Sequence, residues 1–231
     1  SVTGSGGEVD VLSQWSYSNP DPIRIAQATD ELFAMAAGAA APQRVMKMTQ
    51  IIWYRSLTAP KPKPGEEDRD PAAAWKDAVP GADFLTIAPD HLRAAFWTKI
   101  ARPVQGIMYH GWDSLVDCGK TNGYCYTHPE AQTALADLVR DVVTPLGPTL
   151  LQVPDIECSV GYLESFAAQM FAGRGSRGWS RDPMYLVVQY AQLQPRVLFD
   201  ETVMAGGIEG LKVLFMPDCD VLPRGLADRV R

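Results

Sequence analysis

One pattern repeats along the chain from residue 8: a short apolar run rich in β-branched and aromatic residues, a loop, and then a segment with helical periodicity. The runs up to residue 143 are predicted to be strands at 8–15, 44–53 and 104–112. Helices are predicted after them at 23–40, 89–101 and 129–143. Strands that alternate with helices favour parallel pairing, because a parallel connection needs a crossover that a helix supplies. The predicted fold class is therefore α/β.

A proline-rich stretch follows the third helix. Two prolines, Pro145 and Pro148, are expected to end that helix, and the extended segment near residue 155 is typical of a domain junction. Beyond it the pattern predicts an open α/β sheet, with strands at 159–163, 196–199 and 212–216 and helices at 184–193 and 223–231. We therefore expect two domains, residues 1–155 and residues 156–231.

Neither set of strands makes a finished sheet. Three βα units cannot close a barrel, and three short strands leave the second sheet with an unpaired edge. We therefore expect the folded protein to contain further polypeptide, upstream of this chain or from a second chain, that completes a barrel. A homo-oligomer, or association with the missing part of the barrel, is the predicted assembly.

Charge and composition exclude several partners and cofactors. The chain has 21 Lys plus Arg against 27 Asp plus Glu, and no basic cluster of the kind that binds nucleic acid. The longest apolar stretch, 32–41, is too short to cross a bilayer. The four cysteines lack Cys-x-x-Cys spacing, and only three histidines accompany them. We predict no nucleic acid, no membrane, no metal and no cofactor.

Cys118 and Cys125 lie in one loop, 117–125, where two glycines and an asparagine permit the chain reversal that a disulfide needs. A disulfide between them is predicted, and two free thiols are the alternative. The disulfide would indicate an extracytoplasmic location. Without it, a cytoplasmic location is expected.

The predicted strands of the first part end in aromatic and polar residues, at the edge where parallel sheets bind ligands. Aromatic faces stack on sugar rings, and Gln, Arg and His supply hydrogen bonds for hydroxyl groups. The alternative for each Trp or Tyr is core packing, and for the histidine a structural role. The predicted saccharide-binding residues are Trp15, Tyr17, Gln50, Trp53, Tyr54, Arg55, Tyr109, His110 and Trp112.

Asp113, directly after the third strand, is the best-placed carboxylate for catalysis, and a turn-capping role is its alternative. Further carboxylates, Glu66, Glu67, Asp68 and Asp70, lie in a Pro-rich loop that gives them no rigid support, so a solvated loop is the simpler interpretation. No strand end carries a Glu, which counts against a complete pair of hydrolytic carboxylates.

Segments 50–55, 87–97 and 106–112 resemble the last strands of a (β/α)8-barrel glycoside hydrolase. Segments 162–165, 185–197 and 210–220 resemble the start of the glutamine-amidotransferase-like domain that follows the barrel in family 42 β-galactosidases and their relatives. The resemblance implies that residues 8–143 form the sixth to eighth βα units, with the acid/base Glu outside this sequence. It also implies a nucleophilic Glu at the end of the seventh strand, where this chain has Gln50 and Trp53 instead.

We predict a carbohydrate-active hydrolase that cleaves O-glycosidic bonds. One alternative is a non-catalytic carbohydrate-binding relative, and another is an amidotransferase-like structural or oligomerisation module. A true amidotransferase needs a nucleophilic Cys flanked by glycines, whereas Cys219 lies in Pro217-Asp218-Cys219-Asp220.

Overall fold

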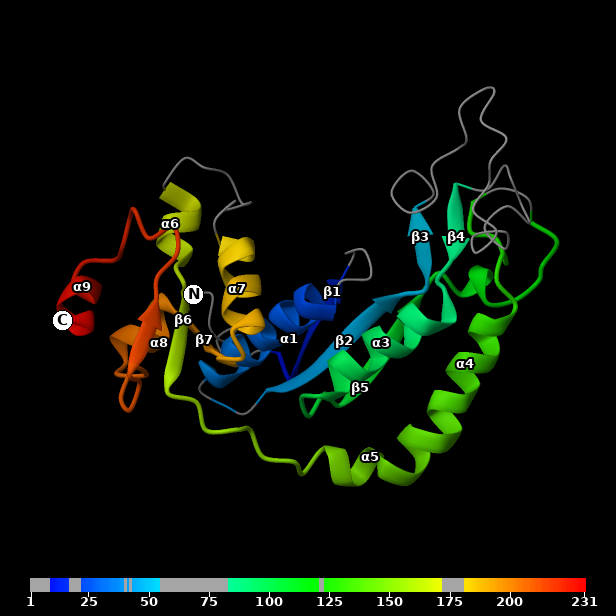
Figure 1. The fold of residues 1–231 in the computed structure, drawn as a ribbon, viewed down its shortest axis with the longest axis horizontal. Helices are drawn as coiled ribbons and strands as arrows, with labels where there is room; N and C mark the ends of the chain where they lie inside the picture. Colours follow the sequence, from blue (N-terminus) through cyan, green and yellow to red (C-terminus); the bar gives the residue numbers. More distant parts are fainter. Residues whose placement is uncertain are drawn as a thin grey trace. The chain divides into compact units, whose positions relative to one another are not determined.

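The computed structural model describes residues 9–16, 22–39, 41, 43–54, 83–120, 123–171 and 181–231 (Figure 1). Its strands are β1 (Val11–Ser16), β2 (Arg44–Gln50), β3 (Ile52–Tyr54), β4 (Phe84–Thr86), β5 (Gly106–His110), β6 (Val160–Glu164), β7 (Arg196–Phe199) and β8 (Val213–Phe215). Its α-helices are α1 (Pro22–Ala37), α3 (Pro89–Ile100), α4 (Glu130–Leu138), α5 (Thr144–Leu150), α6 (Phe166–Phe171), α7 (Arg181–Tyr190), α8 (Asp200–Met204) and α9 (Leu226–Val230). A 3-10 turn, η2 (Trp112–Ser114), and a π-helical turn, η3 (Val139–Val143), complete the described elements.

The described strands form a sheet of order β1-β2-β5, a pair β3-β4 and a sheet of order β7-β6-β8. In the last sheet, β6 pairs parallel with both neighbours. In the first, the Arg44 N–H donates to the Asp10 carbonyl before β1, and the Ile51 N–H donates to the His110 carbonyl at the end of β5, both at 2.9 Å. The first bond joins the starts of β1 and β2, and the second joins the ends of β2 and β5. This is the pattern of parallel neighbours. The prediction of an α/β chain with parallel sheets is confirmed.

The predicted strand 44–53 is in fact two strands that separate at Ile51. The Ile51 N–H donates to the His110 carbonyl of β5, whereas the Ile51 carbonyl accepts the Ile87 N–H, both at 2.9 Å. The chain then leaves the parallel sheet, and β3 pairs antiparallel with β4, with Ile52 opposite Thr86. The sequence pattern missed β4 because it is three residues long and its partner lies about thirty residues earlier.

The chain divides into two compact units, each described here by itself. The first takes residues 1–14, 23–46 and 154–231, and the second takes residues 15–22 and 47–153. The predicted domains, 1–155 and 156–231, stay a prediction.

The first unit buries both faces of the sheet β7-β6-β8. Neighbouring residues of β6 point to opposite faces, so Tyr162 belongs to one buried cluster and Leu163 to another. The Tyr162 and Tyr185 rings meet edge to face at 5.4 Å. The Tyr185 hydroxyl donates to Asp30 of α1 at 2.8 Å, and burial raises the pKa of this tyrosine. A parallel sheet covered on both faces is the usual arrangement in α/β proteins.

The second unit has its core between the strand ends and helices α3 and α4. Its largest buried cluster contains Ile51, Trp53, Leu85, Ile87, Leu92, Leu115, Ala131, Ala134 and Leu135. The unit also buries two lysines, Lys47 of β2 and Lys99 of α3. Burial, and then the nearby Lys47 charge, lower the pKa of Lys99 to about 7.

The helix that begins at Glu130 does not end at the prolines, contrary to the prediction. It continues through η3 into α5 (Figure 1). Pro145 stands in the first turn of α5, where a backbone N–H needs no partner, and Pro148 lies inside the helix. The π turn directly precedes Pro145 and interrupts the α-helical hydrogen-bond pattern there.

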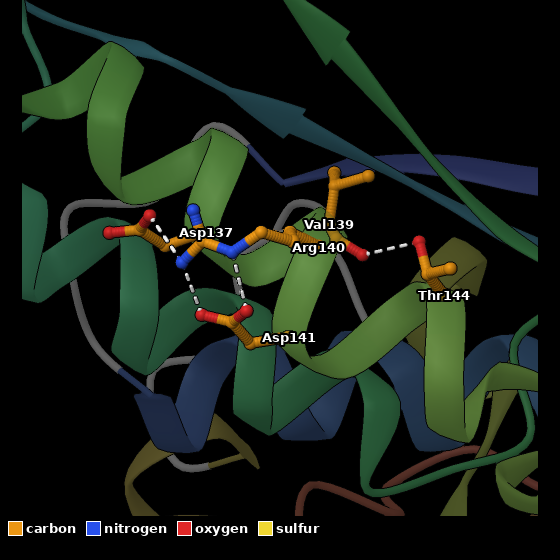
Figure 2. Close-up of polar contacts among 5 residues, drawn as sticks. All are labelled: Asp137, Val139, Arg140, Asp141 and Thr144. Atoms are coloured by element: carbon orange, nitrogen blue, oxygen red, sulfur yellow. Dashed lines mark hydrogen bonds and ion pairs between the residues drawn. The ribbon is translucent and has the colours of Figure 1, made fainter.

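Side chains brace this π turn (Figure 2). The Thr144 hydroxyl donates to the Val139 carbonyl at 2.8 Å, and Arg140 contacts Asp137 at 2.9 Å and Asp141 at 2.6 Å. Hydrogen bonds from Arg140 hold the pKa of Asp141 below its usual range. None of the helices in the described ranges is both long and apolar enough to span a membrane.

Candidate functional site

The predicted site residues of the second unit fall into two environments. Trp53 is 7% exposed, belongs to the buried cluster and contacts the ring of His91 at 4.7 Å. Tyr109 packs against the same cluster, and burial raises its pKa to about 12. Gln50 is buried as well. For Trp53 and Tyr109, the structure therefore has the core packing that was the alternative to ligand binding.

Trp15 and His110 are brought together from the ends of β1 and β5. Their ring centroids are 4.4 Å apart and their planes are inclined by 68°. Both side chains are half-buried. Two of the predicted residues therefore meet at the carboxyl edge of this sheet, although β2 lies between their strands.

Tyr124 completes this surface, and the sequence pattern missed it. Its hydroxyl lies 3.1 Å from His110 Nε2, and its ring meets Phe84 edge to face at 4.7 Å. A β-bridge joins the backbones of Phe84 and Tyr124. We call Trp15, His110, Tyr124 and Phe84 the aromatic cluster. Tyr124 belongs to a Gly-rich loop, where composition indicates only a turn.

The loop that carries Tyr124 is fixed by Thr86, a fully buried residue of β4. Its hydroxyl donates to the Ser114 carbonyl at 2.8 Å and accepts the Thr127 N–H at 2.9 Å. In return the Thr86 N–H donates to the Thr127 hydroxyl at 2.8 Å. Both ends of the loop are thus held at one side chain.

Gly111 turns the chain directly after β5. Its φ of +92° is a left-handed conformation that favours glycine, and a Cβ there would lie 2.7 Å from Ile52 Cγ2. The turn leaves Trp112 61% exposed and brings Asp113 into an ion pair with Lys120, both partly exposed. The hydrogen bond to Asp113 raises the pKa of Lys120.

Several predicted residues fall outside the described structure. Tyr17 and Arg55 lie outside the described ranges, as do the carboxylates of the loop 60–70. Tyr54 is described only as backbone, at the end of β3.

The predicted disulfide between Cys118 and Cys125 does not form. Neither thiol is in a disulfide: Cys118 is exposed, whereas Cys125 is fully buried with its thiol 3.6 Å from the Gly123 carbonyl. The loop turns Cys125 inward beside Thr86, whose hydroxyl lies 3.3 Å from the Cys125 carbonyl, and leaves Cys118 toward solvent. The disulfide was the argument for an extracytoplasmic location, so that argument is removed.

The strand ends of the first unit also carry polar residues. β6 ends in the buried Glu164, so the expectation that no strand end carries a Glu is wrong for this unit. Ser165 and Asp200 there stabilise the fold. The Ser165 hydroxyl donates to Asp200 at 3.1 Å, and Asp200 accepts the Ala167 N–H at 3.0 Å, so this pair caps α6. Burial raises the pKa of the Cys219 thiol to about 12, which argues against a nucleophile there. Across the described residues, no group of three or more His, Cys, Asp or Glu could hold a metal ion.

No protein-family model matches this chain, and no curated protein matches it. Among solved structures, a crystal structure of a GH5_18 from Bifidobacterium longum subsp. infantis is similar, with a TM-score of 0.49 and 12% sequence identity. The similarity covers 92% of this chain and 46% of that one. This chain therefore spans less than half the length of that solved protein.

Proposed function

We propose that this chain is part of a carbohydrate-active protein that cleaves O-glycosidic bonds, and that a saccharide binds over the aromatic cluster and Trp112. The observation that carries the proposal is the meeting of Trp15 and His110, at 4.4 Å, with the Tyr124 hydroxyl beside them. Flat rings next to hydrogen-bonding groups suit a sugar, which offers C–H faces and hydroxyl groups together.

Trp112 is the side chain best suited to stacking in this site. It is 61% exposed, whereas the predicted partner Trp53 is buried in the core. A stacked sugar ring would remove apolar surface of Trp112 from water, which favours binding by about 1–3 kcal/mol. Trp53 instead packs in the core of the second unit.

Asp113 is the carboxylate we propose for the chemistry. It forms an ion pair with Lys120, and we assign it the role of nucleophile or general base. Hydrolysis by two carboxylates then needs an acid from elsewhere, which the resemblance to family 42 implies upstream. A second candidate is a non-catalytic carbohydrate-binding protein. The ion pair between Asp113 and Lys120 favours this candidate, because the carboxylate already has a partner within the chain.

We further propose that residues 8–143 belong to a (β/α)8-type barrel and that residues 156–231 begin an amidotransferase-like domain with a structural role. The parallel order β7-β6-β8 and the raised pKa of Cys219 support this role. A homo-oligomer is the proposed assembly. Phe171, Val187 and Tyr190 support it, because each is an apolar side chain more than 60% exposed, and association would remove this surface from water.

The test measures binding and turnover on a panel of oligosaccharides and 4-nitrophenyl glycosides. Trp112→Ala should weaken binding by about 1–3 kcal/mol, whereas Trp97→Ala, which removes a half-exposed Trp of α3, should leave binding unchanged. Asp113→Asn should lower turnover at least about a hundredfold. Wild-type binding without turnover would select the non-catalytic candidate, and no binding to any glycan would refute the proposal.

A further inference from the structure

We propose that Tyr124 is a positioning residue that sets the tautomer of His110. In this arrangement the Tyr124 hydroxyl donates to His110 Nε2, so the imidazole proton lies on Nδ1 and serves as a hydrogen-bond donor to the bound saccharide. The tautomer is inferred from the contact between Tyr124 and His110 and from the chemistry of the two groups, whereas the role of its proton rests on the proposed function.

The direction of the hydrogen bond follows from the chemistry of the two groups. Tyr124 and His110 Nε2 are 3.1 Å apart, within hydrogen-bond distance. A phenol is a good donor, and the unprotonated nitrogen of a neutral imidazole is a good acceptor. When Nε2 accepts, the one proton of the neutral ring must be on Nδ1.

The surroundings keep the His110 ring in place. Trp15 lies against it at 4.4 Å and the Tyr124 ring at 5.5 Å, each edge to face. The His110 backbone is held by the Ile51 N–H. Tyr124 is itself held through its ring contact and β-bridge to Phe84. The ring therefore has few alternative orientations, and its donor is set before a ligand binds.

The second nitrogen of the ring is left for a ligand. Within the part of the chain that the structure describes, His110 Nδ1 makes no hydrogen bond. The other two histidines are described by different contacts: the His91 ring meets the Trp53 ring at a tilted angle, and the His128 backbone N–H donates to Thr86.

The first experiment uses ¹⁵N-histidine NMR on the whole 231-residue chain without ligand, at a pH where the ring is neutral. The chain has three histidines, so the His110 signals can be assigned by substitution. Wild-type protein should show the Nδ1–H tautomer. Tyr124→Phe, which removes only the hydroxyl, should shift His110 toward the Nε2–H form that free histidine prefers.

The matched control is Tyr126→Phe, because the Tyr126 hydroxyl donates to the Pro129 carbonyl in the same loop. It should leave the His110 tautomer unchanged. An Nε2–H tautomer in wild-type protein overturns the proposal, and so does a Tyr124→Phe spectrum identical to that of wild type. If Tyr124→Phe does not fold, the wild-type spectrum alone decides.

The second experiment measures affinity for the best-bound glycan of the panel. Tyr124→Phe should weaken it about 2- to 10-fold, the effect of one misplaced neutral hydrogen bond, and Tyr126→Phe should not. A shifted tautomer with unchanged affinity overturns the donor role. Failure of every glycan to bind wild-type protein refutes the proposed function and with it the donor role, while the tautomer is judged by the first experiment.

Discussion

Replacing Lys99 with methionine should stabilise the protein and remove a pH dependence of its stability. Lys99 is 1% exposed on α3, and the Lys47 side chain, also fully buried, adds a like charge nearby. Burial first, and this neighbour second, lower the Lys99 pKa from 10.5 to about 7. Charging Lys99 therefore opposes folding.

The sign and size follow from proton uptake. The folded lysine, with a pKa of about 7, is half protonated at pH 7 and almost wholly neutral at pH 9, whereas the unfolded lysine keeps its proton. Unfolding therefore takes up about half a proton at pH 7 and about one proton near pH 9. Stability must then rise with pH, by up to about 1.4 kcal/mol per unit and by about 2 kcal/mol over this window. Above pH 9 the raised pKa values of Tyr109 and Cys219, both about 12, give the opposite slope, so the window ends there.

The assay is urea unfolding at pH 7, 8 and 9, comparing wild type with Lys99→Met and with Lys212→Met, whose side chain is exposed. Lys99→Met should gain about 1–4 kcal/mol at pH 7, the range for replacing a buried charge by an apolar residue of similar shape. Its advantage should shrink toward pH 9. Parallel pH profiles for wild type and Lys99→Met would refute the reasoning.

Three further predictions concern residues around the site. Trp53→Ala should cost about 3–5 kcal/mol of unfolding free energy as a core truncation, while Trp112→Ala should change it by less than about 0.5 kcal/mol; thermal melts of both variants check this, and equal losses would contradict it. Native protein should be alkylated at Cys118 within minutes and at Cys125 only after unfolding, as peptide mass spectrometry can show; equal rates would contradict the burial of Cys125. Gly111→Ala should destabilise by about 1–3 kcal/mol, because it combines a positive φ with a close contact; an unchanged unfolding midpoint would contradict the strain.

The sequence predicted the longer helices and the parallel strands because their signals are local, whereas the short helices α6 and α8 were missed. The periodicity of segments 89–101 and 196–199 depends on residues a few positions apart, and the structure has α3 and β7 there. The pairing of β3 with β4 and the role of Tyr124 depend on contacts between distant segments, which periodicity does not register.

The same limit explains the candidate site. Trp53 and Trp112 both follow predicted strands, but one packs under α3 while the other follows a left-handed glycine turn into solvent. Trp53 is a core residue because β3 separates from β2 and pairs with β4, and this change of sheet cannot be read from the residue pattern. The prediction that Pro145 and Pro148 end the helix was wrong for another reason. The helix continues through a π turn, which the residue pattern does not predict.

The buried Thr86 hydroxyl anchors both ends of the loop that carries Tyr124. Ser114 on one side, and Thr127 with His128 on the other, bond to this one oxygen. Between these anchors Leu115, Tyr124 and Cys125 also contact the core or β4, whereas residues 116–120 are exposed. In evolutionary terms the exposed run 116–120 is the part of the loop that can vary while the scaffold stays constant.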